Sequence, residues 1–352
     1  MLINIHRQAE LFFQACRTNS WVPAYLRDRG FDLGTQRSWR VGYAPNDWRA
    51  LTRHLRTRGF SDTAIEQSGL ARRTNRGMLI DFFRDRVMLP IKDPDGATIA
   101  FVARSRDSEP KYLKSPRTPL YAKGRALFGV HTLTADLKPV IAEGPLDAIA
   151  ISAVCKGQLA GVSPCGTALT SEHVAALRAA TALTNGVVIA FDGDSAGRTA
   201  AVHSYALFKN ICTAEAVVFS AGQDPAGVLR DAGPDALAKI LHTQARPLAD
   251  LVTDTAIEPW QEHLVYPEGR LNTLRSAGKA ISAMAPADVA RQVARVADRL
   301  DFDHAAVTET VADFVTTRLA LADFPTPPTI NGAAASPAGR KPSERSLRGP
   351  TP

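Results

Sequence analysis

The chain of 352 residues has few cysteines and lacks any long apolar run. Its four cysteines include no C-x-x-C pair, so neither a zinc site nor a disulfide framework is expected. No stretch approaches the ~20 uncharged apolar residues of a membrane span. His6, Arg7 and Glu10 interrupt the start, where a signal peptide would have its apolar region. We therefore expect a cytoplasmic protein with no membrane partner.

Aromatic residues are also scarce, at 7% of the chain. This scarcity argues against recognition of single strands mainly by base stacking. We expect the tryptophans to pack in or against the core, namely Trp21, Trp39, Trp48 and Trp260. Apolar residues make up 45% and charged residues 22%, which is typical of a folded globular protein and excludes a wholly disordered chain.

The net charge of +7 is unevenly distributed along the chain. Residues 1–128 contain 23 basic and 12 acidic residues, whereas residues 129–324 contain 15 basic and 22 acidic residues. A basic half beside an acidic half suits an enzyme that binds a polyanion with one surface and divalent cations with the other. An uneven but purely solvated surface would give the same count.

The middle of the chain alternates β-rich runs with helical patterns. The β-rich runs are 139–144, 158–166, 186–194 and 214–220, and the helical patterns between them are 145–157, 171–180 and 196–211. Strands joined by helix-sized connections form parallel sheets, and ligands bind such sheets outside the carboxyl ends of the strands. The fold class predicted here is therefore α/β.

The flanking regions have different patterns. Apolar spacing predicts helices over most of residues 1–58 and again over 228–324, and the segment 82–104 is typical of two strands around an Asp-Pro-Asp-Gly turn. We divide the chain into a basic N-terminal α+β part, a catalytic α/β part, a helical part and a disordered tail. Their boundaries are 1–130, 131–227, 228–324 and 325–352.

Acidic residues follow the predicted strands. Glu143 comes after the first strand, and Asp192 and Asp194 come after the third. Side chains in an extended segment alternate, so Asp192 and Asp194 point the same way. Magnesium prefers oxygen ligands of this kind, and pairs of metal ions promote phosphoryl transfer.

Two further acids are expected at the same edge of the sheet. Asp147 lies near the start of the helix after the first strand, and Asp224 follows the fourth strand. Each acid alone could be a helix cap or a turn residue. Several carboxylates at one edge would repel each other unless cations offset their charge.

The segments EGPLDAIA (143–150) and AFDGDSAGR (190–198) resemble the Toprim signature. Three upstream segments are similar to the N-terminal half of the polymerase core of DnaG-type bacterial primases: 39–55, 81–96 and 111–130. The resemblance covers about residues 5–320. It implies a four-stranded parallel Toprim sheet with flanking helices, preceded by a basic subdomain and followed by a helical segment.

The resemblance also implies a function, a DNA-directed RNA polymerase that makes short primers on single-stranded DNA, for example for a mobile element. Its implied cofactor is Mg²⁺ or Mn²⁺. Glu143, Asp192 and Asp194 would be the catalytic metal-binding acids, with Asp147 and Asp224 as further metal acids. Template or triphosphate contacts are implied for Arg84, Arg86, Arg104, Lys111 and Lys123. Its implied partners are the template, nucleoside triphosphates, and a replicative helicase or a separate zinc-domain protein.

The sequence departs from the family pattern in several places. Lys114 stands where the family commonly has Asn, and Ala221 stands where it often has an acid. The zinc-binding and helicase-binding domains of replicative primases are not recognised in it, so we expect initiation to need help. Two alternatives stay open: a Toprim-type nuclease, in which the same acids cleave DNA, and a non-catalytic single-stranded DNA-binding accessory of replication.

Overall fold

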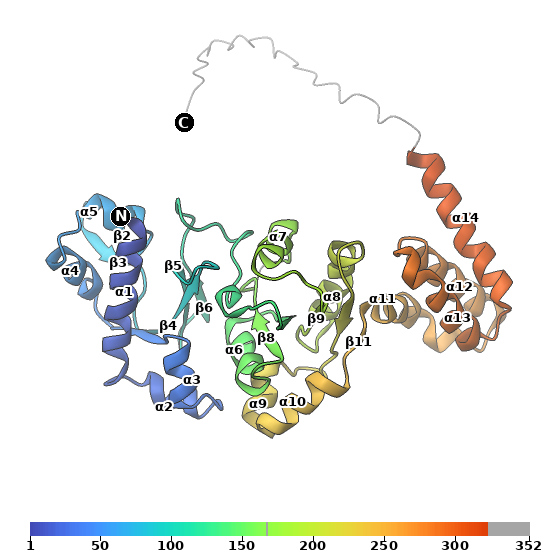
Figure 1. Cartoon of the computed structure of the whole chain (residues 1–352), viewed down its shortest axis with the longest axis horizontal. Helices are drawn as coiled ribbons and strands as arrows, with labels where there is room; N and C mark the ends of the chain where they lie inside the picture. Colours follow the sequence, from blue (N-terminus) through green and yellow to red (C-terminus); the bar gives the residue numbers. More distant parts are fainter. Residues whose placement is uncertain (167, 323–352) are drawn as a thin grey trace, which may run out of the picture.

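The structure is a computed structural model that describes residues 1–166 and 168–322. Figure 1 shows three parts in sequence order along the long axis: an N-terminal part, a central sheet with its helices, and a group of C-terminal helices. The predicted disordered tail, 325–352, lies outside the described residues. Among the helices of the described residues, none has the length and apolar character of a membrane span.

The N-terminal part is a four-stranded antiparallel sheet, a two-stranded sheet and short helices. The larger sheet has the order β1-β4-β5-β6, with β1 (Gly42–Ala44), β4 (Arg86–Lys92), β5 (Thr98–Arg104) and β6 (Tyr112–Lys114). The other elements are α1 (Leu2–Arg17), α2 (Val22–Arg27), α3 (Leu33–Ser38), α4 (Ala50–Thr57), α5 (Asp62–Gln67), β2 (Ala71–Arg73) and β3 (Leu79–Asp81). The predicted hairpin is confirmed as β4 and β5. Asp93 accepts a hydrogen bond from the Ala97 amide at 2.8 Å and closes the turn.

The central sheet contains the four predicted parallel strands. They are β7 (Lys138–Ile141), β8 (Leu159–Val162), β9 (Val187–Ile189) and β10 (Ala214–Ala216), and the helices between them are α6 (Pro145–Val154), α7 (Ser171–Ala180) and α8 (Ser195–Phe208). Their order is β10-β9-β7-β8, and a two-residue strand, β11 (Arg246–Pro247), adds an antiparallel edge beside β10. The α/β prediction is confirmed.

The strand order fixes where a ligand would bind. From β7 the chain passes to β8 on one side and then to β9 on the other, so the order reverses between β7 and β9. Open parallel sheets bind ligands in the crevice beyond the carboxyl ends of the strands at such a point. Ile141 pairs with Ile189 across these two strands, so Glu143 and Asp192 follow at the same edge.

The C-terminal part is helical, as predicted. Its elements are α9 (Pro225–Ala232), α10 (Pro234–Thr243), α11 (Leu248–Ile257), the 3-10 helix η2 (Glu258–His263), α12 (Pro267–Ile281), α13 (Pro286–Leu300) and α14 (His304–Ala322). In Figure 1, α9 and α10 lie under the central part, whereas α11 leads from the sheet to the group formed by α12, α13 and α14.

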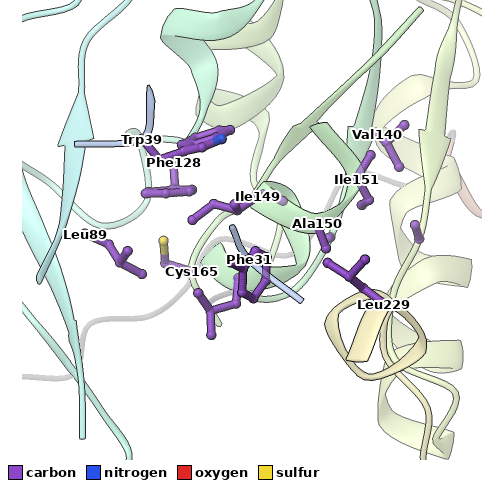
Figure 2. Packing of buried hydrophobic residues seen from close by; sticks show 14 of the residues in the cluster. Phe31, Trp39, Leu89, Phe128, Val140, Ile149, Ala150, Ile151, Cys165 and Leu229 are labelled. Atoms are coloured by element: carbon purple, nitrogen blue, oxygen red, sulfur yellow. The ribbon is translucent and has the colours of Figure 1, made fainter. Parts of the chain in front are cut away.

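One buried apolar cluster joins the N-terminal part to the central sheet. Figure 2 shows Phe31, Trp39 and Leu89 from the N-terminal part near Phe128 and Ile149. The rings of Trp39 and Phe128 stack with centroids 5.2 Å apart. Because these residues share one core, the basic N-terminal part is held in a fixed orientation against the sheet.

The expectation that the tryptophans pack in or against the core is confirmed for Trp39 and for Trp21, which packs against the cluster, and is wrong for Trp48. Trp39 is 7% exposed, but Trp48 is 58% exposed. The Arg84 guanidinium lies over the Trp48 ring at 3.8 Å. An exposed indole is stabilised in this way when a guanidinium covers the face of its ring.

Close packing of α6 on β8 gives a stability prediction. A Cβ at Gly161 would lie 2.1 Å from the Ala148 carbonyl oxygen and 2.6 Å from its Cα. Neither backbone atom can move without displacing α6. We expect Gly161→Ala to lower the free energy of unfolding by about 3 kcal/mol, measured by urea denaturation. Gly124→Ala is the matched control, because a Cβ there meets nothing within 4 Å. Equal stability of both variants would contradict the packing argument.

Candidate active site

Five carboxylates gather beyond the carboxyl ends of the parallel strands, and we call them the acid edge. They are Glu143, Asp147, Asp192, Asp194 and Asp224. Each of the three that show a raised pKa owes part of the shift to other members of the set. These acids are therefore electrostatically coupled, and their assignment as metal-binding and catalytic residues stays a prediction.

Three of the acids sit at helix N-termini. Asp194 caps α8 and accepts from the Gly197 amide at 2.7 Å, and Asp224 caps α9 through the Gly227 amide. Asp147 is in the first turn of α6 and accepts from the Ala226 amide at 3.0 Å. The same side chains therefore act as helix caps and remain candidates for metal binding. A helix N-terminus also stabilises negative charge.

Glu143 and Asp192 meet directly. The Asp192 amide donates to Glu143 Oε1 at 3.2 Å. Gly197 allows this approach, because a Cβ there would lie 2.8 Å from Glu143 Oε1 and 2.3 Å from the Asp192 carbonyl oxygen. Among the residues that the structure describes, Asp192 Oδ1 is buried with no hydrogen-bond partner. A buried carboxylate oxygen without a donor is free to bind a cation.

The acids raise one another's pKa. Burial, and then the charges of Glu143, Asp224 and Asp194, raise the pKa of Asp192 to about 7. Burial and Asp224 raise the pKa of Asp147 to about 8. The pKa of Glu143 is also raised, first by burial. Groups that disfavour each other's charge so strongly gain when a cation lies between them.

The donor set fits a hard divalent cation. All five side chains offer carboxylate oxygens, which Mg²⁺ and Mn²⁺ prefer over nitrogen and sulfur ligands. Within residues 1–166 and 168–322, however, no three acidic, histidine or cysteine side chains are arranged as a complete ligand set. Mutual repulsion keeps carboxylates apart when no cation offsets it.

The charges of two of the predicted basic residues act on the acid edge. The charge of Arg104 lowers the pKa of Asp147, and the charge of Lys111 lowers that of Asp192, each as a smaller effect opposing burial. Arg104 Nε donates to the Tyr25 hydroxyl at 2.7 Å, and its Nη1 donates to the Tyr112 hydroxyl. These contacts hold the guanidinium in one orientation beside the acids.

The other three predicted basic residues have different surroundings. Arg84 donates to the Asp81 carbonyl oxygen at 2.7 Å. Arg86 is 7% exposed and donates to the Pro110 carbonyl oxygen at 2.7 Å. Lys123 is exposed on the loop before Phe128. Within the described residues, no hydrogen bond or ion pair joins these three side chains to the acid edge.

Sequence reasoning missed some side chains that support the site. Tyr25 lies 79 residues from Arg104, and no local pattern joins them. Tyr112 and Lys114 lie on β6 two residues apart, so strand alternation could have indicated a common face. Lys114 Nζ donates to the Gly166 carbonyl oxygen at 3.3 Å, and the Gly166 amide donates to the Glu143 carbonyl oxygen. The family departure at Lys114 therefore lies beside the acid edge.

Two family sequence models match the chain. Residues 11–134 match the N-terminal domain of the DNA primase catalytic core, and residues 140–229 match a Toprim-like domain. The chain is 33% identical to the DNA primase of Streptomyces coelicolor over 282 residues, which are 77% of this chain and 43% of that protein. It is 35% identical to the DNA primase of Pseudomonas aeruginosa over 255 residues, 69% of this chain and 38% of that protein.

Solved structures agree with the sequence matches. The RNA polymerase domain of Mycobacterium tuberculosis primase DnaG, solved with a double-stranded DNA oligomer that carries a 6-nucleotide overhang, has a TM-score of 0.72 at 28% identity. That match covers 86% of this chain and 98% of the other. A DNA primase domain from Pseudomonas aeruginosa has a TM-score of 0.73 at 27% identity and covers 89% of this chain and 100% of the other.

These matches extend through the N-terminal part, the parallel sheet and the helices that follow it. The chain belongs to the family of DnaG-type primase catalytic cores. It spans less than half the length of the two curated relatives from Streptomyces and Pseudomonas.

The raised pKa of Asp192 predicts how stability depends on pH. The pKa is about 7 in the folded protein and 3.8 without the fold, so the folded state holds the extra proton between these values. In chelator, the free energy of unfolding therefore falls as pH rises from about 4 to about 7. We expect Asp192→Asn to lose less stability over this range, measured by urea denaturation at several pH values.

Magnesium and a surface variant provide the controls for this measurement. Magnesium should stabilise the wild type above pH 7 more than it stabilises Asp192→Asn, because the cation offsets the charge that the variant lacks. Asp136→Asn, at an exposed position, should follow the wild type. Parallel pH curves for the wild type and Asp192→Asn would rule out Asp192 as the group responsible.

Proposed function

We propose that this chain is a DNA-templated RNA polymerase that makes short primers on single-stranded DNA. The observation that carries the proposal is the acid edge at the reversal point of the sheet, faced by Arg104 and Lys111 from the basic N-terminal part. Carboxylates and cations on opposite sides of one site suit a reaction that joins metal ions, a triphosphate and a template. Membership in the primase core family supports the same reaction.

In this proposal Glu143, Asp192 and Asp194 hold the catalytic Mg²⁺ or Mn²⁺, with Asp147 and Asp224 completing the acidic set. The metal, when bound, would activate the attacking 3′-hydroxyl and offset charge on the triphosphate. The unpartnered Asp192 Oδ1 is the oxygen best prepared to bind it. Burial of Asp147 and its hydrogen bond to Ala226 suit a role in keeping α6 and α9 together beside the metal ligands.

The cations would bind phosphates. Arg104, held by Tyr25 and Tyr112, and Lys111 are placed to contact the triphosphate beside the acids. Arg84, Arg86 and Lys123 are proposed as template contacts. Phosphate contacts of this kind give affinity without sequence preference and set the register of the strand.

The partners and the working division of the chain follow from this proposal. Single-stranded DNA and nucleoside triphosphates are the substrates, in the cytoplasm, and a replicative helicase or a separate zinc-domain protein would assist initiation. The ranges 1–130, 131–227 and 228–324 would serve as the template-binding, catalytic and helical parts.

Primer extension and de novo synthesis on single-stranded DNA test the proposed function. With Mn²⁺ and ribonucleotides, we expect the wild type to extend an annealed primer. Asp192→Asn and Glu143→Gln should each lower the extension rate by about 100-fold or more, because each removes a negative charge that holds the metal at the reacting phosphate. Product would be measured on denaturing gels, and Asp136→Asn should retain the wild-type rate.

Other outcomes would decide for the alternatives. Metal-dependent strand cleavage without nucleotides would indicate a Toprim-type nuclease. DNA binding that is unchanged in Asp192→Asn, with no synthesis by the wild type in either format, would indicate a non-catalytic binder. Extension without de novo synthesis would retain the polymerase and assign initiation to a partner.

A further inference from the structure

Four arginines and two aspartates form a ladder between α11 and α13. Arg291, Arg295 and Arg299 stand four residues apart on α13, and Arg246 comes from β11. The ladder has these shortest contacts: Arg291 to Asp250 at 2.6 Å, and Arg246, Arg295 and Arg299 to Asp254 at 3.0, 3.1 and 3.2 Å. Among the described residues, Arg246, Arg295 and Arg299 share Asp254, and only Arg295 has a second carboxylate, Asp250 at 3.4 Å, so positive charge is in excess at the Asp254 end.

The Asp254 end of the ladder opens into a hollow of about 180 Å³, which we call the arginine hollow. Arg198, Arg246 and Arg299 line it, together with Asp254, Thr255 and Glu258. Arg198 Nη1 contacts Glu258 Oε1 at 2.7 Å, and all three arginine side chains are more than a third exposed. Within residues 1–166 and 168–322, the buried Thr255 hydroxyl has no hydrogen-bond partner. The hollow thus combines N–H donors with one unused hydroxyl.

The arginine hollow lies next to the acid edge. Arg198 lies one turn into α8, and its amide donates to the Asp194 carbonyl oxygen at 3.1 Å. A smaller hollow beside Asp192 and Asp194 shares Arg198, Val218 and Leu251 with it. Figure 1 shows α11 leading from the sheet toward α13, so the ladder extends away from the acids on the side opposite the N-terminal part.

We propose that the arginine hollow binds a backbone phosphate of the nucleic-acid strand held at the acid edge. The inference rests on the proposed function and extends it to the helical part of the chain. Guanidinium groups donate two parallel hydrogen bonds to phosphate oxygens, and a free hydroxyl adds a third donor. The excess positive charge disfavours a metal cation and favours an oxyanion. A strand bound here would be held on both sides of the reacting group, by Arg104 and Lys111 on one side and by the hollow on the other.

Binding measurements on the full chain test this proposal without requiring catalysis. The probe is a labelled single-stranded DNA oligonucleotide, followed by fluorescence anisotropy over a series of salt concentrations. We expect the double variant Arg246→Gln/Arg299→Gln to bind on the order of tenfold more weakly at low salt. The slope of log K against log salt should become shallower by about 0.7 for each phosphate that the variant no longer neutralises.

Matched variants separate binding from stability. Arg291→Gln removes an arginine of the same ladder at the Asp250 end, away from the hollow, and should bind like the wild type. Arg246→Lys/Arg299→Lys retains the charge and should restore the salt slope, with thermal unfolding confirming that each variant is folded. If the double Gln variant does not fold, Arg299→Gln alone gives the same comparison. Equal weakening by Arg291→Gln, or an unchanged slope in the double Gln variant, would overturn the proposal.

A second probe distinguishes the source of the phosphate. Inorganic pyrophosphate, titrated by calorimetry, reports on a site for the phosphates of free nucleotides. Loss of pyrophosphate binding with retained oligonucleotide binding would overturn assignment of the hollow to a strand. Loss of oligonucleotide binding in the double Gln variant would support the hollow even if the wild type made no primer, so failure of the proposed function and failure of the hollow give different results.

Discussion

Five carboxylates lie at one edge of the central sheet, and the repulsion among them makes the site depend on charges that offset it. Folding brings these acids together at one edge of the sheet, although burial and neighbouring acids raise the pKa of Glu143, Asp147 and Asp192. Part of the cost is offset locally, because the N-termini of α6, α8 and α9 all point toward this edge and carry Asp147, Asp194 and Asp224. A bound cation would offset the remaining electrostatic cost. Because the charges of these carboxylates are only partly offset within the protein, the acid edge is suited to bind a metal ion together with the substrate.

The N-terminal part must face this edge in one orientation if its cations are to act there. The shared core supplies that rigidity, since Trp39 and Phe128 stack at the junction and apolar side chains from both parts pack around them. Polar contacts then orient the Arg104 guanidinium. Tyr25 on α2 and Tyr112 on β6 hold Arg104 from two elements, so the guanidinium cannot turn away toward solvent. Apolar packing sets the distance between the two parts, and two hydroxyls set the direction of one charge.

Most of the fold is predictable from the sequence, because the patterns that specify its helices and strands lie within short segments of the chain. Strand alternation and βα connection lengths predict the parallel sheet, and the order of strands brings Glu143 and Asp192 together without knowledge of side-chain contacts. The antiparallel strand β11 escapes prediction, since two residues ending in Pro247 have no periodicity to detect. The large apolar side chain of Trp48 suggests a buried position, whereas in the structure its exposed ring is covered by Arg84, which is distant in sequence. Contacts between distant segments carry no signature in one sequence.

The net charge of a region does not show where anions bind within it. Residues 129–324 are acidic overall, which predicts cation binding and hides any anion site within them. The structure separates the two functions by element: the acids end the strands, while arginines spaced four apart on α13 meet too few carboxylates to neutralise them. Helical periodicity could have indicated that Arg291, Arg295 and Arg299 share a face, but not that Asp254 lies opposite. A region with negative total charge therefore presents a positive surface next to its acids, as a chain that binds both metal ions and phosphates requires.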